Sequence, residues 1–457
     1  MEIKKIDFKD RLLFFITILV PLVPFYFQDY DYKIVILVLG YYIGLFPLMF
    51  SYFYNKKKFL IFELHCFFYS IFFFLLPIIL INKYDHSDKF FFLTSLISIF
   101  GLIILIITFY LLNFFNIKKK YLLSVHNEPN IFIIYYIFFI IFLIFKLFTN
   151  SNSSLYFYFL VGFNYYLILN LDYKSNKLAY LSLATQNIIL FIYTIYDFVF
   201  MDSIFFLIDL LAVKWFFKKK INWFFIFIII LLVTSSSGIK NIYRYQQSIN
   251  LNEKYNSNFF IKNFFSSDVN NNLISAYNFQ DYSEFNKSAA ISRLQWPYLS
   301  LNLAIKKTPE KIPFLWGESY LPIFFKIFPS LIFKHQYQEN FGNKFGRLYE
   351  IANYNDYQTS FNVPFITEFY INFGIVGVSL GMFFIGIFFY ILENFFISKK
   401  KKNNLSNLII LTCSIPLCIP ESNLSLMLGA FFQNLLIIFI IIFFFNKFFF
   451  IIRNKFI

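Results

Sequence analysis

The sequence predicts an all-α polytopic integral membrane protein with about 12 transmembrane helices and one large, partly helical external loop. The chain is 59% hydrophobic and only 14% charged, with a mean hydropathy of +0.63, which is typical of membrane proteins. Its apolar runs approach the roughly twenty residues that a helix needs to cross a bilayer. Short basic connectors separate these runs, and a single long polar stretch, 238–363, interrupts the alternation.

Residues 1–237 are expected to form an N-terminal transmembrane bundle of about nine helices. The first apolar run resembles a signal peptide, but no small-residue cleavage site follows it, so we expect an uncleaved span. The shortest run contains Asp209. The expected spans of this part are 11–27, 33–53, 59–81, 90–112, 131–149, 154–171, 178–198, 203–217 and 221–237.

Residues 364–457 are expected to hold the three remaining spans and a basic cytoplasmic tail. Basic connectors stay on the cytoplasmic side of a membrane. Twelve spans with both termini in the cytoplasm place every lysine cluster inside and the polar loop outside. The net charge of +15 is therefore explained by topology, and we expect no nucleic-acid partner. The remaining spans are 364–392, 405–420 and 424–445, and the lysine clusters lie at 56–58, 118–120, 218–220 and 399–402.

The polar loop 238–363 is expected to contain helices that pack near the membrane surface. A cap at Asp281 begins a helix that Pro297 is expected to end, and a second helix is predicted over 298–306. The apolar stretch 320–333 is broken by two prolines and is too short to span. We therefore expect it to lie in the outer interface.

The same topology excludes several classes of function. The longest cytoplasmic connector, 113–130, is too short for a nucleotide-binding domain, and the chain has no phosphate-binding loop or dinucleotide fingerprint. The energy for any reaction must arrive with the substrate at the outer face, and we expect no cofactor. All three cysteines fall in apolar runs, so no disulfide framework supports the loop.

Arginine is rare in this chain, and its positions are informative. Of 40 basic residues only five are arginine, and Arg244, Arg293 and Arg347 lie in the loop. Where lysine is the usual cation, an arginine points to a role that needs a guanidinium. The planar guanidinium binds two phosphate oxygens at once and does not lose its proton.

Short motifs follow one another through residues 290–390: Arg293, Thr308-Pro309-Glu310, Gly317-Glu318-Ser319-Tyr320, Phe345-Gly346-Arg347 and Glu368-Phe-Tyr-Ile-Asn372-Phe-Gly374. This succession resembles the Wzy-type O-antigen polymerases, the oligosaccharide repeat-unit polymerases of bacterial surface polysaccharides. The resemblance implies a GT-C-like membrane transferase architecture in the bacterial inner membrane. The chain departs from the family pattern after Pro329, where an expected arginine is absent and Lys334 or Lys326 is the candidate substitute.

The resemblance implies a transfer at the periplasmic face. A growing glycan moves from undecaprenyl pyrophosphate to a hydroxyl of an incoming lipid-linked repeat unit, with a chain-length regulator and a flippase as plausible partners. The leaving diphosphate needs fixed cations, and the acceptor hydroxyl needs a base. The candidates are, for the diphosphate, Arg293, Arg347, Lys334 and Arg244; for the base, Glu368, Glu318 and His335; and for the sugars, Tyr320, Trp316 and Asn372.

Each main candidate also has a purely structural interpretation. Arg347 has Glu339 and Glu350 nearby in the sequence and would then form only a surface ion pair. Glu368 would only cap its helix, together with Asn372 one turn later. The glycine pair at 377 and 381 favours close helix packing within the chain over dimerisation.

Three other functions stay open. An O-antigen ligase-like transferase would differ only in its acceptor, a flippase or other transporter would relocate the lipid-linked oligosaccharide, and an assembly protein would have no catalytic site. We assign no metal. The acidic patches in the first two external connectors are the alternative site for a divalent cation, and they consist of Asp29 and Asp31, and of Asp85 and Asp88.

Overall fold

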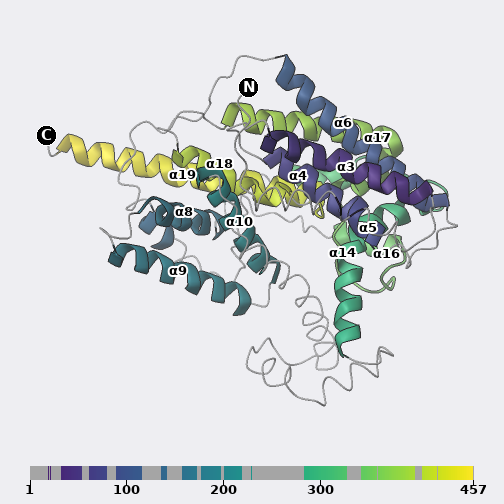
Figure 1. The fold of residues 1–457 in the computed structure, drawn as a ribbon, viewed down its shortest axis with the longest axis horizontal. Helices are drawn as coiled ribbons and strands as arrows, with labels where there is room; N and C mark the ends of the chain where they lie inside the picture. The colour runs from purple at the N-terminus through teal and green to yellow at the C-terminus, as the bar shows by residue number, and fades with distance from the viewer. Residues whose placement is uncertain are drawn as a thin grey trace. The chain divides into compact units, whose positions relative to one another are not determined.

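The fold is known from a computed structural model, and every regular element in its described part is helical. No strand occurs in that part (Figure 1). The all-α fold class is therefore confirmed there. The described residues are 32–53, 61–79, 89–115, 135–140, 157–171, 177–196, 200–218, 282–326, 341–357, 359–396, 404–418 and 420–455, with the single residues 19, 21 and 228.

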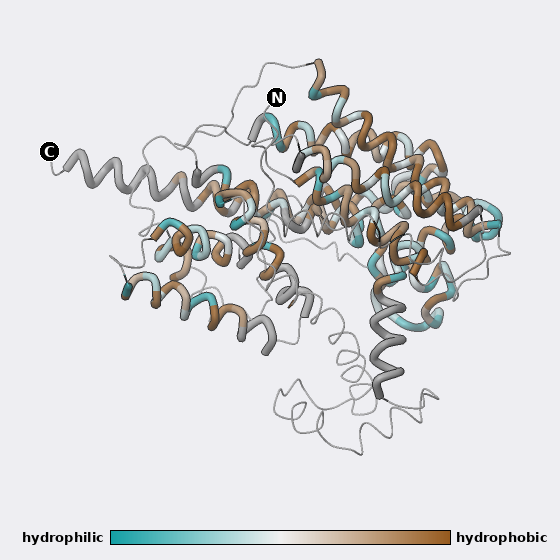
Figure 2. Tube along the Cα trace, viewed as in Figure 1, coloured by the Kyte–Doolittle hydropathy of each residue, from teal (hydrophilic) through white to brown (hydrophobic). Residues whose placement is uncertain are grey.

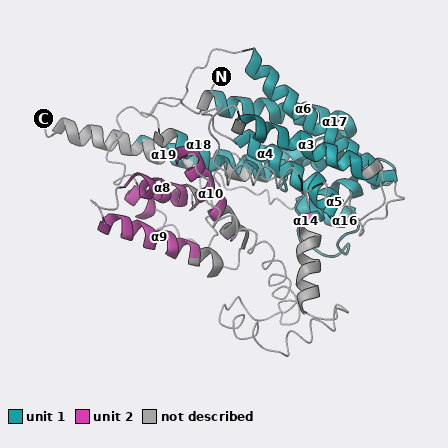
Figure 3. Ribbon diagram, in the orientation of Figure 1, with its two compact units in different colours: residues 1–128, 295–457 teal, residues 129–294 magenta. Residues whose placement is uncertain are grey.

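The chain divides into two compact units (Figure 3). Unit 1 consists of Met1–Glu128 and Gln295–Ile457, and unit 2 of Pro129–Leu294. All candidate site residues with described side chains lie in unit 1. The predicted domain boundary at 363/364 falls just before a long helix, and the boundary at 237/238 lies outside the described residues. Unit 2 contains α8 (Phe157–Asn170), α9 (Lys177–Tyr196) and α10 (Phe200–Lys218).

Four helical segments in the described part are long and apolar enough to cross a membrane. Their mostly hydrophobic composition is visible in Figure 2. They coincide with the expected spans 33–53, 59–81, 90–112 and 364–392, so the chain has the character of an α-helical membrane protein. The segments are α3 (Tyr32–Phe53); α4 (Ile61–Ser70), which continues through the π-helical turn η2 (Ile71–Leu75) into α5 (Leu76–Ile79); α6 (Lys89–Phe114); and α17 (Phe365–Ile391), which the π-helical turn η5 (Leu392–Phe396) extends.

Helices occupy several other expected spans as well. These are α8, α9 and α10 in unit 2 and, in unit 1, α18 (Asn404–Ser414), the 3-10 turn η7 (Ile415–Cys418) and α19 (Leu424–Lys455). The expected spans 11–27, 131–149 and 221–237 lie largely outside the described residues. The total of twelve spans and their orientation stay predictions.

Helices α6 and α17 pack side by side, and α17 carries residues of the candidate site (Figure 1). Gly101 of α6 lets the two helices approach, since a Cβ there would lie 3.1 Å from Ile366 and 3.2 Å from Val378. Small residues commonly allow such close contact in membrane helix pairs. Phe62 of α4 stacks on Phe109 of α6, with ring centroids 3.7 Å apart, so α4 packs against this helix pair.

The loop helix that Pro297 was expected to end continues through it, so that prediction is wrong. Helix α14 runs without interruption from Tyr282 to Lys307. A proline inside a helix removes one backbone hydrogen bond and crowds the preceding turn, but tertiary contacts hold this helix on both sides of the proline. Trp296 donates its indole N–H to the Asn362 carbonyl, and the buried Tyr298 hydroxyl donates to the Phe91 carbonyl at 2.8 Å.

Candidate functional site

The site begins at a break in the membrane helix α17. Gly374 has φ 62° and ψ −145°, a backbone conformation that only glycine adopts readily. In a continuous helix the Ile371 carbonyl would accept a bond from residue 375. At the break, this carbonyl accepts a bond from Leu315 N at 3.0 Å. The break thus separates the first segment, 365–372, from the rest of α17 and provides a carbonyl that anchors the loop before it.

The two parts of α17 fold closely against each other. A Cβ on Gly377 would collide with the Phe369 carbonyl oxygen, and a Cβ on Gly381 would collide with the Phe369 ring. The glycine pair at this spacing therefore serves packing within the chain, as predicted. The short first segment, which carries Glu368 and Asn372, is consequently held tightly against the longer one.

Glu368 is a buried junction between three parts of unit 1. Its side chain has no exposed surface. Oε1 accepts a hydrogen bond from Ser319 Oγ at 2.7 Å, and Oε2 accepts one from Leu424 N at 2.7 Å. Leu424 is the first residue of α19, and a helix N-terminus favours a nearby negative charge. Glu368 thereby connects α17, the loop at 315–320 and the start of α19.

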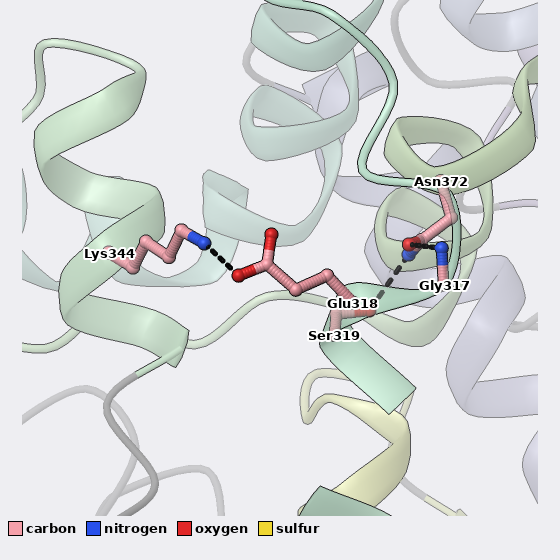
Figure 4. Close-up of polar contacts among 5 residues, drawn as sticks. All are labelled: Gly317, Glu318, Ser319, Lys344 and Asn372. Atoms are coloured by element: carbon pink, nitrogen blue, oxygen red, sulfur yellow. Dashed lines mark hydrogen bonds and ion pairs between the residues drawn. The ribbon is translucent and has the colours of Figure 1, made fainter. Parts of the chain in front are cut away.

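Asn372, one turn after Glu368, binds the same loop, and Figure 4 shows its bonds to Gly317 and Ser319. Together Glu368 and Asn372 form a buried polar anchor for the loop. Asn372 Nδ2 donates to Ser319 Oγ and to the Glu368 carbonyl, both at 2.7 Å. Its Oδ1 accepts from Gly317 N, also at 2.7 Å. Both amide hydrogens of Asn372 are thus used within the protein. Its predicted contact with sugar is untested, and its observed contacts hold the loop.

Two aromatic candidates extend from the anchored loop. Trp316 is 73% exposed, and its ring meets Phe373 edge to face at 5.9 Å. Tyr320 belongs to the 3-10 turn η4 (Glu318–Tyr320) and lies against Phe369, with ring centroids 6.4 Å apart. Burial, and then the charge of Glu368, raise the pKa of Tyr320. Tyr320 therefore keeps its hydroxyl proton at neutral pH.

Glu318 faces outward from the same loop and contacts helix α16 (Phe341–Leu348). Its Oε1 accepts a bond from Lys344 Nζ at 2.5 Å (Figure 4). The side chains of Glu318 and Lys344 are 55% and 36% exposed. This ion pair therefore lies at the protein surface, directly beside the buried anchor.

Arg347 lies three residues after Lys344 on α16. Two contacts orient its guanidinium, one through Nε and one through its flat face. Nε donates to Asn343 Oδ1 at 3.0 Å, and the guanidinium carbon lies 4.2 Å from the centre of the Tyr357 ring. Arg347 forms no ion pair with Glu350, and Glu339, the other acid that a purely structural interpretation named, lies outside the described residues. Glu350 instead accepts a bond from Lys307 Nζ at 2.6 Å, and this bond and charge lower the pKa of Glu350.

The other candidates are not placed by the structure. Arg293 lies within α14, but its side chain is outside the described residues, and so are Arg244, Lys334 and His335 in full. The acidic patches of the first two external connectors also lie outside that part. Among the described residues, no group of three or more His, Cys, Asp and Glu side chains could hold a metal ion.

Sequence reasoning missed Lys344 and the buried acids of the membrane bundle. A lysine three residues before Arg347 on a helix is a detectable signal, because residues at this spacing share a face. Glu63 and Glu393 are 3% and 8% exposed, and an ionisable residue inside a membrane span is itself a signal of function. The backbone N–H of Leu424, which binds Glu368, could not be found from residue types.

In the described part, therefore, one surface carries an exposed carboxylate, two cations and an exposed indole ring beside a rigid polar anchor. Such a surface can bind an anion through the cations and an extended apolar or sugar surface through the aromatic ring. Comparisons with protein-family models, with curated proteins and with solved structures found no match to this chain.

Proposed function

We propose that this protein is a membrane glycosyltransferase that polymerises lipid-linked oligosaccharide repeat units. It transfers the growing glycan from undecaprenyl pyrophosphate to a hydroxyl of the incoming repeat unit at the outer face of the bacterial inner membrane. The resemblance of the motifs to Wzy-type polymerases motivates the proposal. Twelve spans, a GT-C-like architecture and cytoplasmic termini are part of it.

The arrangement of Arg347 carries the proposal. Nε is bonded to Asn343 and the guanidinium lies on Tyr357. No carboxylate of the described residues pairs with it. Asn343 is itself fixed, because its Nδ2 donates to the Asp356 and Thr359 carbonyls at 2.8 and 2.7 Å. A guanidinium that is oriented but has no acidic partner in that part is suited to receive two oxygens of a diphosphate.

The transfer requires one nucleophile, one leaving group and one proton acceptor. The acceptor hydroxyl oxygen forms a bond to the anomeric carbon of the donor sugar. The bond from that carbon to the diphosphate oxygen breaks, and its electron pair stays on the diphosphate. The hydroxyl proton passes to a carboxylate, and Arg347 stabilises the charge that develops on the leaving group.

Of the two described base candidates, Glu318 fits proton transfer better than Glu368. A base must come within hydrogen-bond reach of the proton that it removes. Glu318 is exposed, and its Oε2 has no partner in the described part of the chain. Both oxygens of Glu368 are engaged, and its side chain has no exposed surface. We therefore assign Glu368 to positioning the loop and Glu318 to the proton.

Reconstitution with lipid-linked repeat units tests the proposal. Purified wild-type protein should give products of two or more repeats. Arg347→Lys keeps the charge but loses the two-pronged geometry, so we expect about a tenfold or greater loss of elongation. Arg453→Lys in the C-terminal tail is the matched control and should retain full activity. Normal chain lengths with Arg347→Ala would refute the role of Arg347.

One observation favours a transporter as the second candidate. Three ionisable residues are buried within the segments that are apolar enough to span: Glu63, His65 and Glu393. Such residues often mark ion or substrate pathways in membrane proteins. The same reconstitution separates the alternatives, because a transporter would move the lipid-linked oligosaccharide across the bilayer without extending it. A ligase-like enzyme would transfer the glycan only to a different acceptor.

A further inference from the structure

We propose that Lys344 is a second cation for the diphosphate and that Glu318 is its displaceable counterion. In the resting protein Glu318 forms an ion pair with Lys344, and the incoming diphosphate replaces the Glu318 carboxylate as the partner of Lys344. This inference rests on the proposed function, since it assigns two further roles at the same anion site. It makes Lys344 a binding residue and makes release of the Glu318 carboxylate a consequence of substrate binding.

The helix α16 presents both cations to one side. Lys344 and Arg347 are three residues apart, so their side chains leave neighbouring positions on the helix surface. Arg347 is held by Asn343 and Tyr357, whereas the described contact of Lys344 is the one with Glu318. A diphosphate carries more than one negative charge and matches two adjacent cations better than one.

The exposure of the Glu318–Lys344 pair makes an exchange of partners easy. Ion pairs between solvent-exposed side chains typically change an equilibrium constant by a factor of about five or less. The other ion pair on this surface differs, because Lys307 is only 15% exposed and also donates to the Tyr349 carbonyl at 2.8 Å. Lys307 is therefore fixed by the backbone, and Lys344 is the cation that can change partner.

The loop would stay in place during the exchange. Asn372 binds both Gly317 N and Ser319 Oγ (Figure 4). Ser319 Oγ also donates to the buried Glu368. The residues on both sides of Glu318 are thus anchored, and Glu318 N donates to the Leu315 carbonyl at 3.0 Å. Only the Glu318 side chain needs to rotate, and the released carboxylate remains beside the bound diphosphate.

Titration calorimetry of the purified full-length protein with inorganic diphosphate tests the exchange. Glu318→Gln removes the competing charge and should bind diphosphate about two- to fivefold more tightly. Lys344→Met should bind it at least about tenfold more weakly. In the double variant the gain from Glu318→Gln should disappear, because it acts through Lys344. Glu350→Gln is the control, since it removes the same charge from the Lys307–Glu350 ion pair without freeing Lys344.

The outcomes separate this inference from the proposed function. If Glu318→Gln binds diphosphate no more tightly than Glu350→Gln, or if Lys344→Met binds it as well as wild type, the exchange is refuted even when wild type elongates glycans. If wild type neither binds diphosphate nor elongates, the proposed function itself fails. A parallel titration with undecaprenyl diphosphate in detergent should follow the same order of variants. A lipid that does not compete with inorganic diphosphate would also refute the exchange.

Discussion

Replacement of Glu368 by alanine should strongly destabilise the protein. The variant loses two hydrogen bonds to a carboxylate with no exposed surface, from Ser319 Oγ and from Leu424 N. Hydrogen bonds to charged groups contribute about 1.5–3 kcal/mol each, and a buried donor left unpaired adds to the loss. The Ser319 hydroxyl still accepts from Asn372, but its own proton loses its acceptor, as does the Leu424 N–H. We therefore expect a total loss of about 3–5 kcal/mol in the free energy of unfolding.

Two further variants calibrate this value. Glu368→Gln keeps the shape and one acceptor oxygen, but its NH₂ group only donates. Either Ser319 or Leu424 therefore loses its acceptor, and we expect a loss of about 1–2 kcal/mol. Glu318→Ala removes a carboxylate one residue before Ser319 from an exposed ion pair and should lose less than about 1 kcal/mol. The free energies can be measured by titrating the detergent-solubilised protein with sodium dodecyl sulfate and following the loss of helical signal.

The test is the order of the three variants in free energy of unfolding. The structure requires Glu368→Ala to be the least stable, Glu368→Gln intermediate and Glu318→Ala closest to wild type. Equal stability of Glu368→Ala and Glu318→Ala would mean that the buried junction does not connect the loop to α17 and α19. That result would refute the positioning role assigned to Glu368.

Three other variants address separate parts of the site. Gly374→Ala should lose about 1–3 kcal/mol of unfolding free energy and most elongation activity. The φ of 62° is strained for alanine, and the new Cβ would lie 3.2 Å from Phe314. Retained stability would contradict the break in α17. Tyr349→Phe removes the 2.6 Å bond to Thr308 and should lose about 1 kcal/mol below pH 10. Since burial raises the pKa of Tyr349 from 10.0 to about 12, the folded state favours the neutral phenol, and the advantage of wild type over Tyr349→Phe should shrink as the pH rises through that interval. Trp316→Ala alters a 73% exposed side chain and should change stability by less than about 0.5 kcal/mol while weakening glycan binding in a binding assay; unchanged glycan affinity would remove it from the sugar site.

The helices of the membrane bundle were predictable because their cause is local. An apolar run of sufficient length must form a helix in a bilayer, where no water satisfies its backbone. The expected spans 33–53 and 90–112 accordingly agree closely with α3 and α6. The end of the loop helix at Pro297 was wrong because its continuation depends on contacts of Trp296 and Tyr298 with residues far away in the sequence.

The candidate site was predictable in its residue types and not in their connections. Sequence reasoning placed Glu318, Tyr320 and Asn372 in motifs and left a base role open for Glu368. The partners of Glu368 are a hydroxyl 49 residues earlier and a backbone amide 56 residues later. Such partners depend on where the break in α17 directs the chain. No periodicity or spacing carries that information.

The turn at 315–320 separates the residues that anchor it from the residues that it presents. Gly317 and Ser319 bond inward to Asn372 and Glu368, while Trp316 and Glu318 are exposed. A buried carboxylate is often no more stabilising than a well-packed apolar side chain, so its presence here is best explained by the need to hold this turn in one place. Variants of the inward group should therefore lose stability and elongation together, whereas variants of the outward group should lose elongation alone. An outward variant that unfolds as readily as an inward one would contradict this division.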